Sequence, residues 1–461
     1  MNQMQFQADR VGLFALVAAG LVLAPTPAFA QTDQALLTRV EQMELEIGDL
    51  KARLEKAEGR AAQPAPGPIQ EQAAPETANY RGTAPRAFLS GVSGTAIHFG
   101  GYADVGVAIS DRESGTKSTF VSGTFNPALY LQYKNLLLFE TELEIAVSQD
   151  GATDVELEFA QFDLLLHDNV TLVVGKYLSP VGQYQERLHP SWINRLADSP
   201  AGFGHGGVQP TAEVGLQLRG GVPLGRARFT YALSVGNGPR LDSGGEVMTE
   251  GFGGDDNNNK AISGRIGVLP LPYLEFGASM LRAKVRGPVG EDGAMSATRA
   301  SFAAASVGES AIDFPSTDVD YRLWGLDAAY TRGPWDVRVE YLHGVRDRIT
   351  VPMEDGGEME LLPRLRMTAW YAQMAYRLSG LTQHPILGNF EPVVRYGEYK
   401  VRGLEELEME AAEKRWDLGL NYWFAPAIVL HGAVQHRNFT RRQDGDDDRD
   451  TRLLFQLAYG F

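Results

Sequence analysis

Apolar and polar residues alternate with period two in about sixteen segments between Ala96 and the C-terminus. The clearest segment turns Glu140, Glu142 and Glu144 to one face. Its other face carries Leu137, Phe139, Thr141, Leu143, Ile145 and Val147. Several segments run to ten residues or more, whereas the strands of a soluble sandwich usually have about 5 to 6 residues. The pattern predicts long β-strands whose two faces meet different surroundings.

The links between these segments are short and long in turn. Short links such as 134–135 and 425–427 alternate with long polar ones, namely 176–211, 237–259, 285–320, 344–365 and 438–450. One link, 149–153, is short where the alternation requires a long one. Outer-membrane barrels have short periplasmic turns and longer external loops, and a soluble β-sandwich has no reason to segregate its loops in this way. We therefore predict an all-β fold, a transmembrane antiparallel β-barrel of about 16 strands over residues 95–461.

The ends of the predicted strands agree with a barrel in the outer membrane. The last segment alternates up to Phe461 and resembles the C-terminal signal strand by which such barrels are recognised for insertion. Aromatic residues near strand ends fit girdles at the two membrane interfaces. They are Trp335, Trp370, Trp416, Trp423 and Tyr459. We expect a bacterial outer-membrane location, with outer-membrane lipid and lipopolysaccharide as partners.

Three segments are predicted ahead of the barrel. An apolar run followed by Ala28-Phe29-Ala30 predicts a signal peptide over residues 1–30; a retained membrane anchor would need about 20 apolar residues, and this run is shorter. Residues 34–58 repeat apolar side chains at heptad spacing, and their facing positions carry opposite charges. They predict a short, parallel α-helical coiled coil and hence a homo-oligomer. Residues 59–94 are rich in Pro, Ala and Gln and predict an extended linker.

Composition excludes several classes of function. The chain has no cysteine, so it has no disulfide, zinc-cysteine site or thiol nucleophile. Its formal net charge of −16 argues against nucleic acid as a partner. Neither G-x-S-x-G nor H-E-x-x-H occurs, and the histidines are scattered. The aspartates of residues 444–450 lack the Gly and Glu of an EF-hand and predict a solvated loop. We expect no catalytic activity, no cofactor and no metal site.

The face opposite the apolar one is expected to line the lumen. From the sixth segment onward it repeatedly carries arginine, whereas the third and fourth segments carry glutamate. The basic members include Arg219, Arg228, Arg338 and Arg377, and the acidic ones are Glu140, Glu142, Glu144, Glu156 and Glu158. An acidic sector facing a longer basic wall would create a transverse field that sorts ions. The alternative is that the charges of a polar interior only pair across strands.

The long link after the fifth segment is the candidate constriction. Its basic residues outnumber its two acidic residues, and its aromatic side chains could anchor it to the wall. The basic residues and histidines are Lys176, Arg187, His189, Arg195 and His205, against Glu186 and Asp198. The alternative is an external loop packed on the rim of the barrel.

Three motifs resemble the phosphate-selective porin O and P superfamily, including members with an N-terminal coiled coil. They are GGYADVGVAIS at the start of the barrel, VVGKYLSPVGQ at the entry to the long link, and LLFQLAYGF at the end. The resemblance implies a trimer of water-filled channels for passive diffusion of small hydrophilic solutes, with a basic eyelet that favours anions. It offers Lys176, Arg187 and Arg195 as eyelet candidates. The family's phosphate sites use lysine-rich loops, whereas the external loops here are acidic, which argues against phosphate selectivity. A non-conducting barrel with a structural or surface-binding role is the alternative.

Overall fold

The computed structural model describes residues 94–111, 118–148, 150–241, 247–249, 252–254, 257–286, 318–352, 359–404, 407–440 and 449–461. The predicted signal peptide and coiled coil lie outside these residues, as does all of the predicted linker before Gly94. No helix among the described residues is both long and apolar enough to span a membrane, a finding that does not bear on β-barrels.

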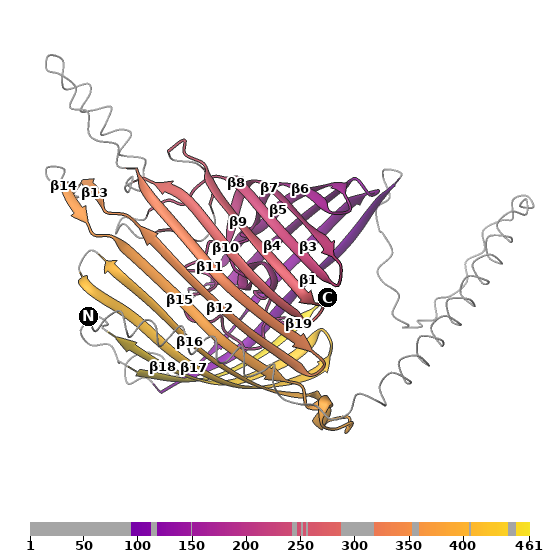
Figure 1. The fold of residues 1–461 in the computed structure, drawn as a ribbon. Helices are drawn as coiled ribbons and strands as arrows, with labels where there is room; N and C mark the ends of the chain where they lie inside the picture. The colour runs from indigo at the N-terminus through magenta and orange to yellow at the C-terminus, as the bar shows by residue number, and fades with distance from the viewer. Residues whose placement is uncertain are drawn as a thin grey trace, which may run out of the picture. The chain divides into compact units, whose positions relative to one another are not determined.

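The described residues are almost entirely β-strands joined into one sheet (Figure 1). The strands are β1 (Thr95–Ser110), β2 (Ser118–Val121), β3 (Thr124–Tyr133), β4 (Leu137–Val147), β5 (Thr153–His167), β6 (Val170–Leu178), β7 (Ala212–Leu224), β8 (Ala227–Gly236), β9 (Ala261–Leu271), β10 (Leu274–Val285), β11 (Val319–Arg332), β12 (Trp335–Arg346), β15 (Leu365–Tyr376), β16 (Phe390–Leu404), β17 (Leu407–Ala425), β18 (Ile428–Thr440) and β19 (Arg449–Gly460). Each pairs with its neighbours in antiparallel register.

The sheet closes on itself because β1 pairs with β19 over nine residues, from Tyr102 opposite Gly460 to Ser110 opposite Arg452. Both β2 and β3 pair with β1, so they are two halves of a single barrel strand. The 17-stranded sheet therefore has 17 − 1 = 16 strand positions around the barrel. This confirms the predicted antiparallel barrel and its strand number. A separate hairpin of β13 (Ile349–Pro352) and β14 (Met359–Leu362) extends the link between β12 and β15.

The links differ in length between the two ends of the barrel. At one end, the short-turn end, residues 225–226, 272–273 and 333–334 join neighbouring strands. The link 377–389 is the longest described at this end and holds two 3₁₀ turns, η1 (Leu378–Gly380) and η2 (Leu387–Asn389). The opposite end, the long-loop end, carries the longer links predicted from the sequence.

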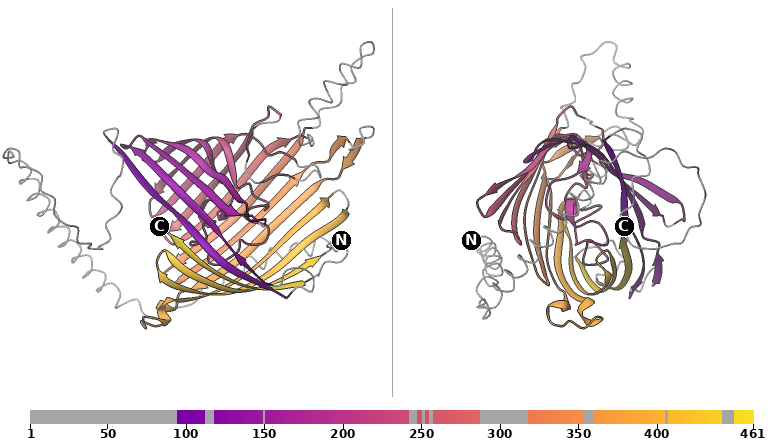
Figure 2. Two further views of the ribbon diagram at one scale, coloured as in Figure 1. Left: turned by 180° about the vertical axis from the view of Figure 1, so that it is seen from behind. Right: turned by 90° about the vertical axis from the view of Figure 1, so that its right-hand side faces the viewer.

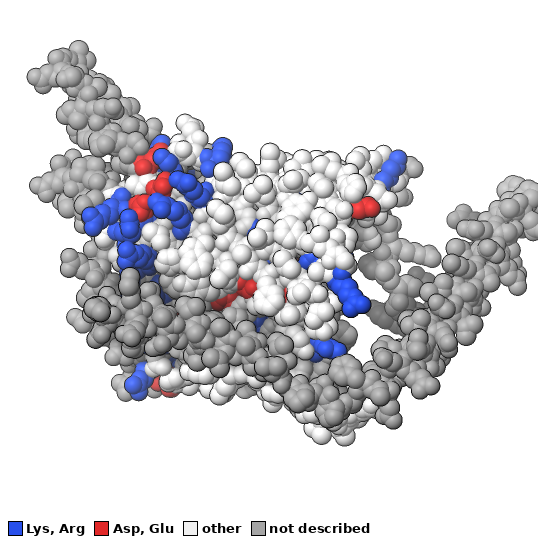
Figure 3. Space-filling model, viewed as in Figure 1, with Lys and Arg blue, Asp and Glu red and all other residues white. Residues whose placement is uncertain are grey.

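The outer surface of the barrel is apolar between its two ends (Figure 3). On β17, Leu418 and Leu420 are exposed on the outward face, whereas Asp417 and Asn421 on the alternate face are buried inside the barrel. A surface of this kind requires lipid, because exposed apolar area in water carries a large free-energy cost. Trp423 differs from the prediction: it is buried on the inward face and is not part of an interfacial girdle.

A β-bulge in β5 changes which of its side chains face inward. The register between β4 and β5 shifts where Glu142 pairs with Phe159 and Leu143 pairs with Leu157. Glu158 before the shift and Gln161 after it are both buried on the inward side. Because an extra residue in one strand inverts the alternation beyond it, period-two counting from the sequence fails past this point.

Candidate solute path through the barrel

The long link between β6 and β7, residues 179–211, folds into the barrel (Figure 2); we call it the inner loop. It reaches the far wall of the barrel. The side-chain amide of Asn421 donates to the carbonyl of Arg195 at 2.9 Å, and His431 Nε2 lies 3.2 Å from the carbonyl of Ser191. The inner loop therefore lies within the lumen and does not pack on the rim.

An apolar core holds the inner loop against the wall. Val181, Tyr184 and Phe203 of the loop belong to one buried cluster with inward-facing side chains of β10, β11, β12 and β15. Phe203 meets Tyr371 edge to face, with ring centroids 5.0 Å apart. Burial of each such apolar side chain contributes about 1.5–3 kcal/mol. The loop is therefore docked by packing as well as by polar contacts.

Glycines let the inner loop approach the wall closely. Gly182 has a φ of +77°, a left-handed conformation that L side chains rarely adopt. A Cβ at this position would collide with the carboxylate of Glu340. The chain then enters the single helical turn α3 (Tyr184–Arg187).

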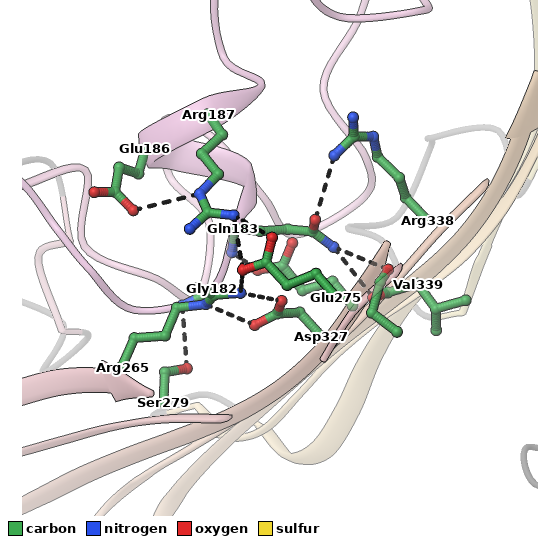
Figure 4. A network of polar contacts seen from close by, with 12 residues as sticks. Gly182, Gln183, Glu186, Arg187, Arg265, Glu275, Ser279, Asp327, Arg338 and Val339 are labelled. Carbon is green, nitrogen blue, oxygen red and sulfur yellow. Dashed lines mark hydrogen bonds and ion pairs between the residues drawn. The ribbon is translucent and has the colours of Figure 1, made fainter. Parts of the chain in front are cut away.

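A network of charged side chains fixes this entry segment (Figure 4). The backbone N–H of Gln183 donates to Glu340 Oε1 at 2.9 Å. Arg187 Nη1 lies 2.8 Å from Glu275 on β10, and Arg265 on β9 donates to the same carboxylate at 2.9 Å. Arg265 also donates to Asp327 on β11 through Nε at 3.0 Å. Two guanidinium groups thus share the largely buried carboxylate of Glu275.

A second set of contacts lies toward the short-turn end. Arg195 lies 3.3 Å from Asp336 and 3.6 Å from Glu391. Arg377 lies 3.4 Å from Glu391. Both guanidinium groups stack over the buried Trp423, at 5.2 and 4.5 Å from the ring centroid. Arg195, Asp336, Arg377 and Glu391 line a cavity of about 520 Å³ that also contacts the 333–334 turn and the 377–389 link.

A third contact fixes the middle of the inner loop at Asp198. Its carboxylate accepts from Arg415 at 2.9 Å and from Gln435 at 3.1 Å, while its carbonyl accepts from Arg395 at 2.9 Å. Burial raises the pKa of Asp198, but Arg415 and Gln435, with a further contribution from Arg395, outweigh it and hold the pKa below its ordinary value of 3.8. Asp198 is therefore ionised at neutral pH and pairs with a buried guanidinium.

The acidic residues gather on the opposite wall. Glu142 accepts from Tyr102 at 3.2 Å and lies 3.8 Å from His189 of the inner loop. Glu140 lies 4.0 Å from Arg219, which pairs more closely with Asp163. Further toward the long-loop end, Glu144 and Glu158 lie near His205 of the inner loop.

The structure brings most of the predicted site residues to the interior. Arg187, His189 and Arg195 lie on the inner loop, and the wall contributes Glu140, Glu142, Glu144, Arg219, Arg338 and Arg377. Arg338 bonds Asp336 at 2.8 Å, and Arg228 lies beside the 225–226 turn at the short-turn end.

Lys176 is the exception. It alternates with the inward-facing Val173 and Tyr177, so it points outward, and its ammonium group contacts the carbonyl of Leu157. The expectation that Lys176 lines the eyelet is therefore wrong, because the strand continues through this residue and sets its side.

The sequence reading missed the carboxylates that partner these arginines. Asp336 and Glu340 lie on β12, Glu391 lies on β16 and Glu275 lies on β10. Period-two counting could have found the first three, because they share a strand face with Arg338 or Arg395; Glu275 lies on the face of β10 opposite that of Arg282. Which carboxylate meets which arginine depends on strand register and on the path of the inner loop.

The last third of the chain, residues 288–461, matches the family model for the phosphate-selective porins O and P. No curated protein matches the chain. Among solved structures, the outer membrane channel DcaP of Acinetobacter baumannii aligns with a TM-score of 0.51 at 12% identity, covering 82% of this chain and all of its own. An anion-selective porin from Comamonas acidovorans aligns at 0.48 with 10% identity, covering 80% of this chain and all of its own. A trimeric form of OmpT from Vibrio cholerae aligns at 0.47 with 12% identity and the same coverages.

At such low identity the alignment with DcaP speaks for the fold alone, and the two alignments below a TM-score of 0.5 carry no argument. The sequence match over residues 288–461 is independent of them. Together with the closed 16-stranded barrel and its apolar outer surface, it indicates an outer-membrane porin.

Proposed function

We propose that the protein is a passive channel for small hydrophilic solutes that prefers anions. The observation that carries the preference is a difference in exposure within three ion pairs of the interior; the Arg415–Asp198 pair, at 7% and 39%, shows the reverse. The side chain of Arg187 is 36% exposed against 14% for Glu275, that of Arg219 33% against 3% for Asp163, and that of Arg377 28% against 4% for Glu391. Each pair is neutral, yet a solute in the lumen meets chiefly the guanidinium group.

Because the acidic wall lies on one side of the path, the two sides of the path differ in the sign of their exposed charge. Glu140 and Glu142 lie on β4 with Arg219 beside Glu140, while the exposed Arg187 and Arg377 lie on the inner loop and beyond β15. Opposite charges on facing walls orient a dipolar solute and separate the routes of cations and anions. This arrangement supports selectivity by charge without a dedicated binding site for one anion. It gives no support to phosphate selectivity in particular.

The proposal is tested by reconstituting the protein in a planar bilayer and measuring the reversal potential in a potassium chloride gradient. We expect stepwise openings with a reversal potential toward that of chloride. Replacing Arg187 and Arg195 with glutamine should reduce the chloride-to-potassium permeability ratio by about two- to fourfold, because each charge near the path is worth about 0.2–0.4 kcal/mol after screening by water and salt.

Arg282→Gln is the matched control, because this arginine is exposed on the outward face of β10, away from the lumen. It should leave the permeability ratio unchanged. Insertion without current would refute the channel and favour the alternative of a structural or surface-binding barrel. A cation-selective current in the unmodified protein would refute the anion preference alone.

We further propose that the outward face at the long-loop end binds phosphate groups of lipopolysaccharide. Among the described residues, the three arginines Arg282, Arg322 and Arg364 form ion pairs with only two carboxylates, Asp320 and Asp347, so this face carries a net positive charge. Figure 3 shows basic side chains gathered at this end of the visible wall. Cations at the level of lipid headgroups attract anionic lipid. Replacing the three arginines with glutamine should lower the lipopolysaccharide that co-purifies, and an unchanged amount would contradict the proposal.

For the assembly we propose a homotrimer. The heptad pattern of residues 34–58 supports a parallel homo-oligomer, and the resemblance to the phosphate-selective porin O and P superfamily implies three subunits. Mass measurement of the detergent-solubilised protein tests it. A monomer at micromolar concentration would contradict it.

A further inference from the structure

The cluster formed by Glu144 of β4, Glu158 of β5 and His205 of the inner loop has no role in the ion pairs that dock the loop. One ligand atom from each of the three lies within 4.8 Å of the others. The imidazole Nε2 of His205 is 3.6 Å from Glu158 Oε1. His205 is half-exposed to the lumen, whereas Glu158 is buried. The cluster is therefore built into the wall on one side and open to solutes on the other.

The carboxylates of this cluster are not balanced by permanent cations. Glu142 lies on the same face of β4, and its recorded ion pair is with His189. In the part of the chain that the structure describes, no lysine or arginine forms an ion pair with Glu142, Glu144 or Glu158. Carboxylates held this close repel each other unless they share a proton or a cation.

An independent observation comes from Asn126 on β3. Its side chain is completely buried, and its amide makes no well-formed hydrogen bond, although it lies close enough to interact with the Glu144 carboxylate. That neighbourhood follows from the pairing of Phe125 with Ile145. A buried amide that lacks well-formed hydrogen bonds costs about 1–3 kcal/mol. A cation held between the carboxylates and the Asn126 side-chain oxygen would remove the share of that cost that falls on the oxygen.

We propose that Glu144, Glu158 and His205, with Asn126 as a further oxygen donor, bind a divalent transition-metal ion such as Zn²⁺. One imidazole and two carboxylates are ligands that Zn²⁺ accepts at about 2.0–2.2 Å, which places neighbouring ligand atoms about 3.3–3.5 Å apart. The His205–Glu158 distance already approaches this value. Glu144 would close the remaining gap by a rotation of its side chain.

His205 can reach the ion because of the loop around it. Gly204 and Gly206 both have left-handed φ values, +75° and +68°. They form a tight bend that presents the imidazole toward the wall. A bound ion would tie this bend of the inner loop to β4 and β5, and it would add positive charge to the acidic wall. We infer that the metal narrows the path and weakens the transverse field.

The binding is tested with zinc chloride by isothermal titration calorimetry on the detergent-solubilised full chain. We expect about one ion per chain, and a loss of affinity of about tenfold or more in His205→Gln and in Glu158→Gln. His98→Gln is the matched control, because His98 is exposed on β1 outside the cluster, and it should bind zinc as the unmodified protein does. Circular dichroism verifies folding, and Glu144→Gln replaces Glu158→Gln if the latter does not fold.

Absence of zinc binding at millimolar concentration, or binding that survives His205→Gln, would overturn the site. Binding of calcium but not zinc would overturn the ligand class. The effect on current rests on the proposed channel, so it is measured separately: zinc should lower the single-channel conductance reversibly on addition of a chelator, and not in His205→Gln. If the barrel binds zinc but conducts no current, the channel fails and the metal site stands.

Discussion

Gly182→Ala is the substitution that most directly tests how the inner loop is held. The position has a left-handed φ of +77°, and the added methyl group would overlap Glu340 Oε1. That carboxylate accepts the backbone N–H of Gln183 at 2.9 Å, and the N–H of Gly182 itself donates to Ser279 at 3.1 Å. The alanine therefore forces the entry segment of the loop away from the wall.

The magnitude has two parts. Alanine in a left-handed conformation costs about 1–2 kcal/mol. Separating Gln183 from the buried Glu340 leaves its backbone N–H without this acceptor, at a cost of about 1–3 kcal/mol. A total of about 2–5 kcal/mol shifts the balance between docked and undocked loop by about one and a half to three and a half powers of ten. Because apolar packing still holds Phe203 and its neighbours, we expect local detachment near α3 and no loss of the barrel.

Two assays measure this detachment. In planar bilayers, Gly182→Ala should raise the mean conductance and the current noise, since a loose loop obstructs the path less and moves within it. In detergent, trypsin should cleave after Arg187, whose carboxylate partners hold it in the unmodified protein. Gly151→Ala is the control, because Gly151 also has a left-handed φ, +85°, but nothing lies near the added methyl group. If the two variants conduct and resist trypsin alike, the steric argument is refuted.

Three further predictions concern the loop anchor, the buried charges and the outer surface. The depressed pKa of Asp198 means that its ionised carboxylate stabilises the docked loop; this contribution is fully present above pH 3.8 and is lost as the pH falls through the depressed pKa. Current noise should therefore rise in that acid range, and Asp198→Asn should be noisy already at neutral pH. A quiet current in acid would contradict the anchor. Arg395→Met leaves the buried carboxylate of Asp417 without the guanidinium that lies 2.8 Å away, and it should lower the free energy of unfolding by about 3–5 kcal/mol. The double variant Arg395→Met, Asp417→Leu should recover much of this loss; urea unfolding in vesicles measures both. Leu418→Arg places a charge on the lipid-facing surface and should lower the free energy of unfolding by about 2–4 kcal/mol in the same assay. Leu381→Arg, in the exposed 377–389 link, should change it little. Equal effects would argue against a lipid-facing β17.

The barrel can be predicted from the sequence alone. Period-two alternation separates lipid-facing from interior residues, because only a strand places neighbouring side chains on opposite faces. The alternation of short and long links determined which end carries the loops. The position of the long link after the fifth segment also predicted which loop lies inside. Arg219, Arg338 and Glu142 on the wall follow from the same counting.

Only the folded barrel shows where the alternation breaks and where a strand ends. The bulge in β5 inverts the alternation beyond Glu158, and β6 continues through Lys176 to Leu178, so this lysine lies on the outward face. A bulge leaves no mark in the alternation itself, since a one-residue shift depends on how the neighbouring strand pairs.

The contacts between distant segments also required the structure. No metal site is expected from the sequence, because its histidines have no ligand spacing. Glu144, Glu158 and His205 come together only because β4 and β5 pair and the inner loop crosses the lumen to meet them. The same holds for Arg195, which finds Asp336, Glu391 and Trp423 on three different strands. Strand periodicity is a local property that the sequence carries, whereas the meeting of a loop with a wall depends on the closure of the whole barrel.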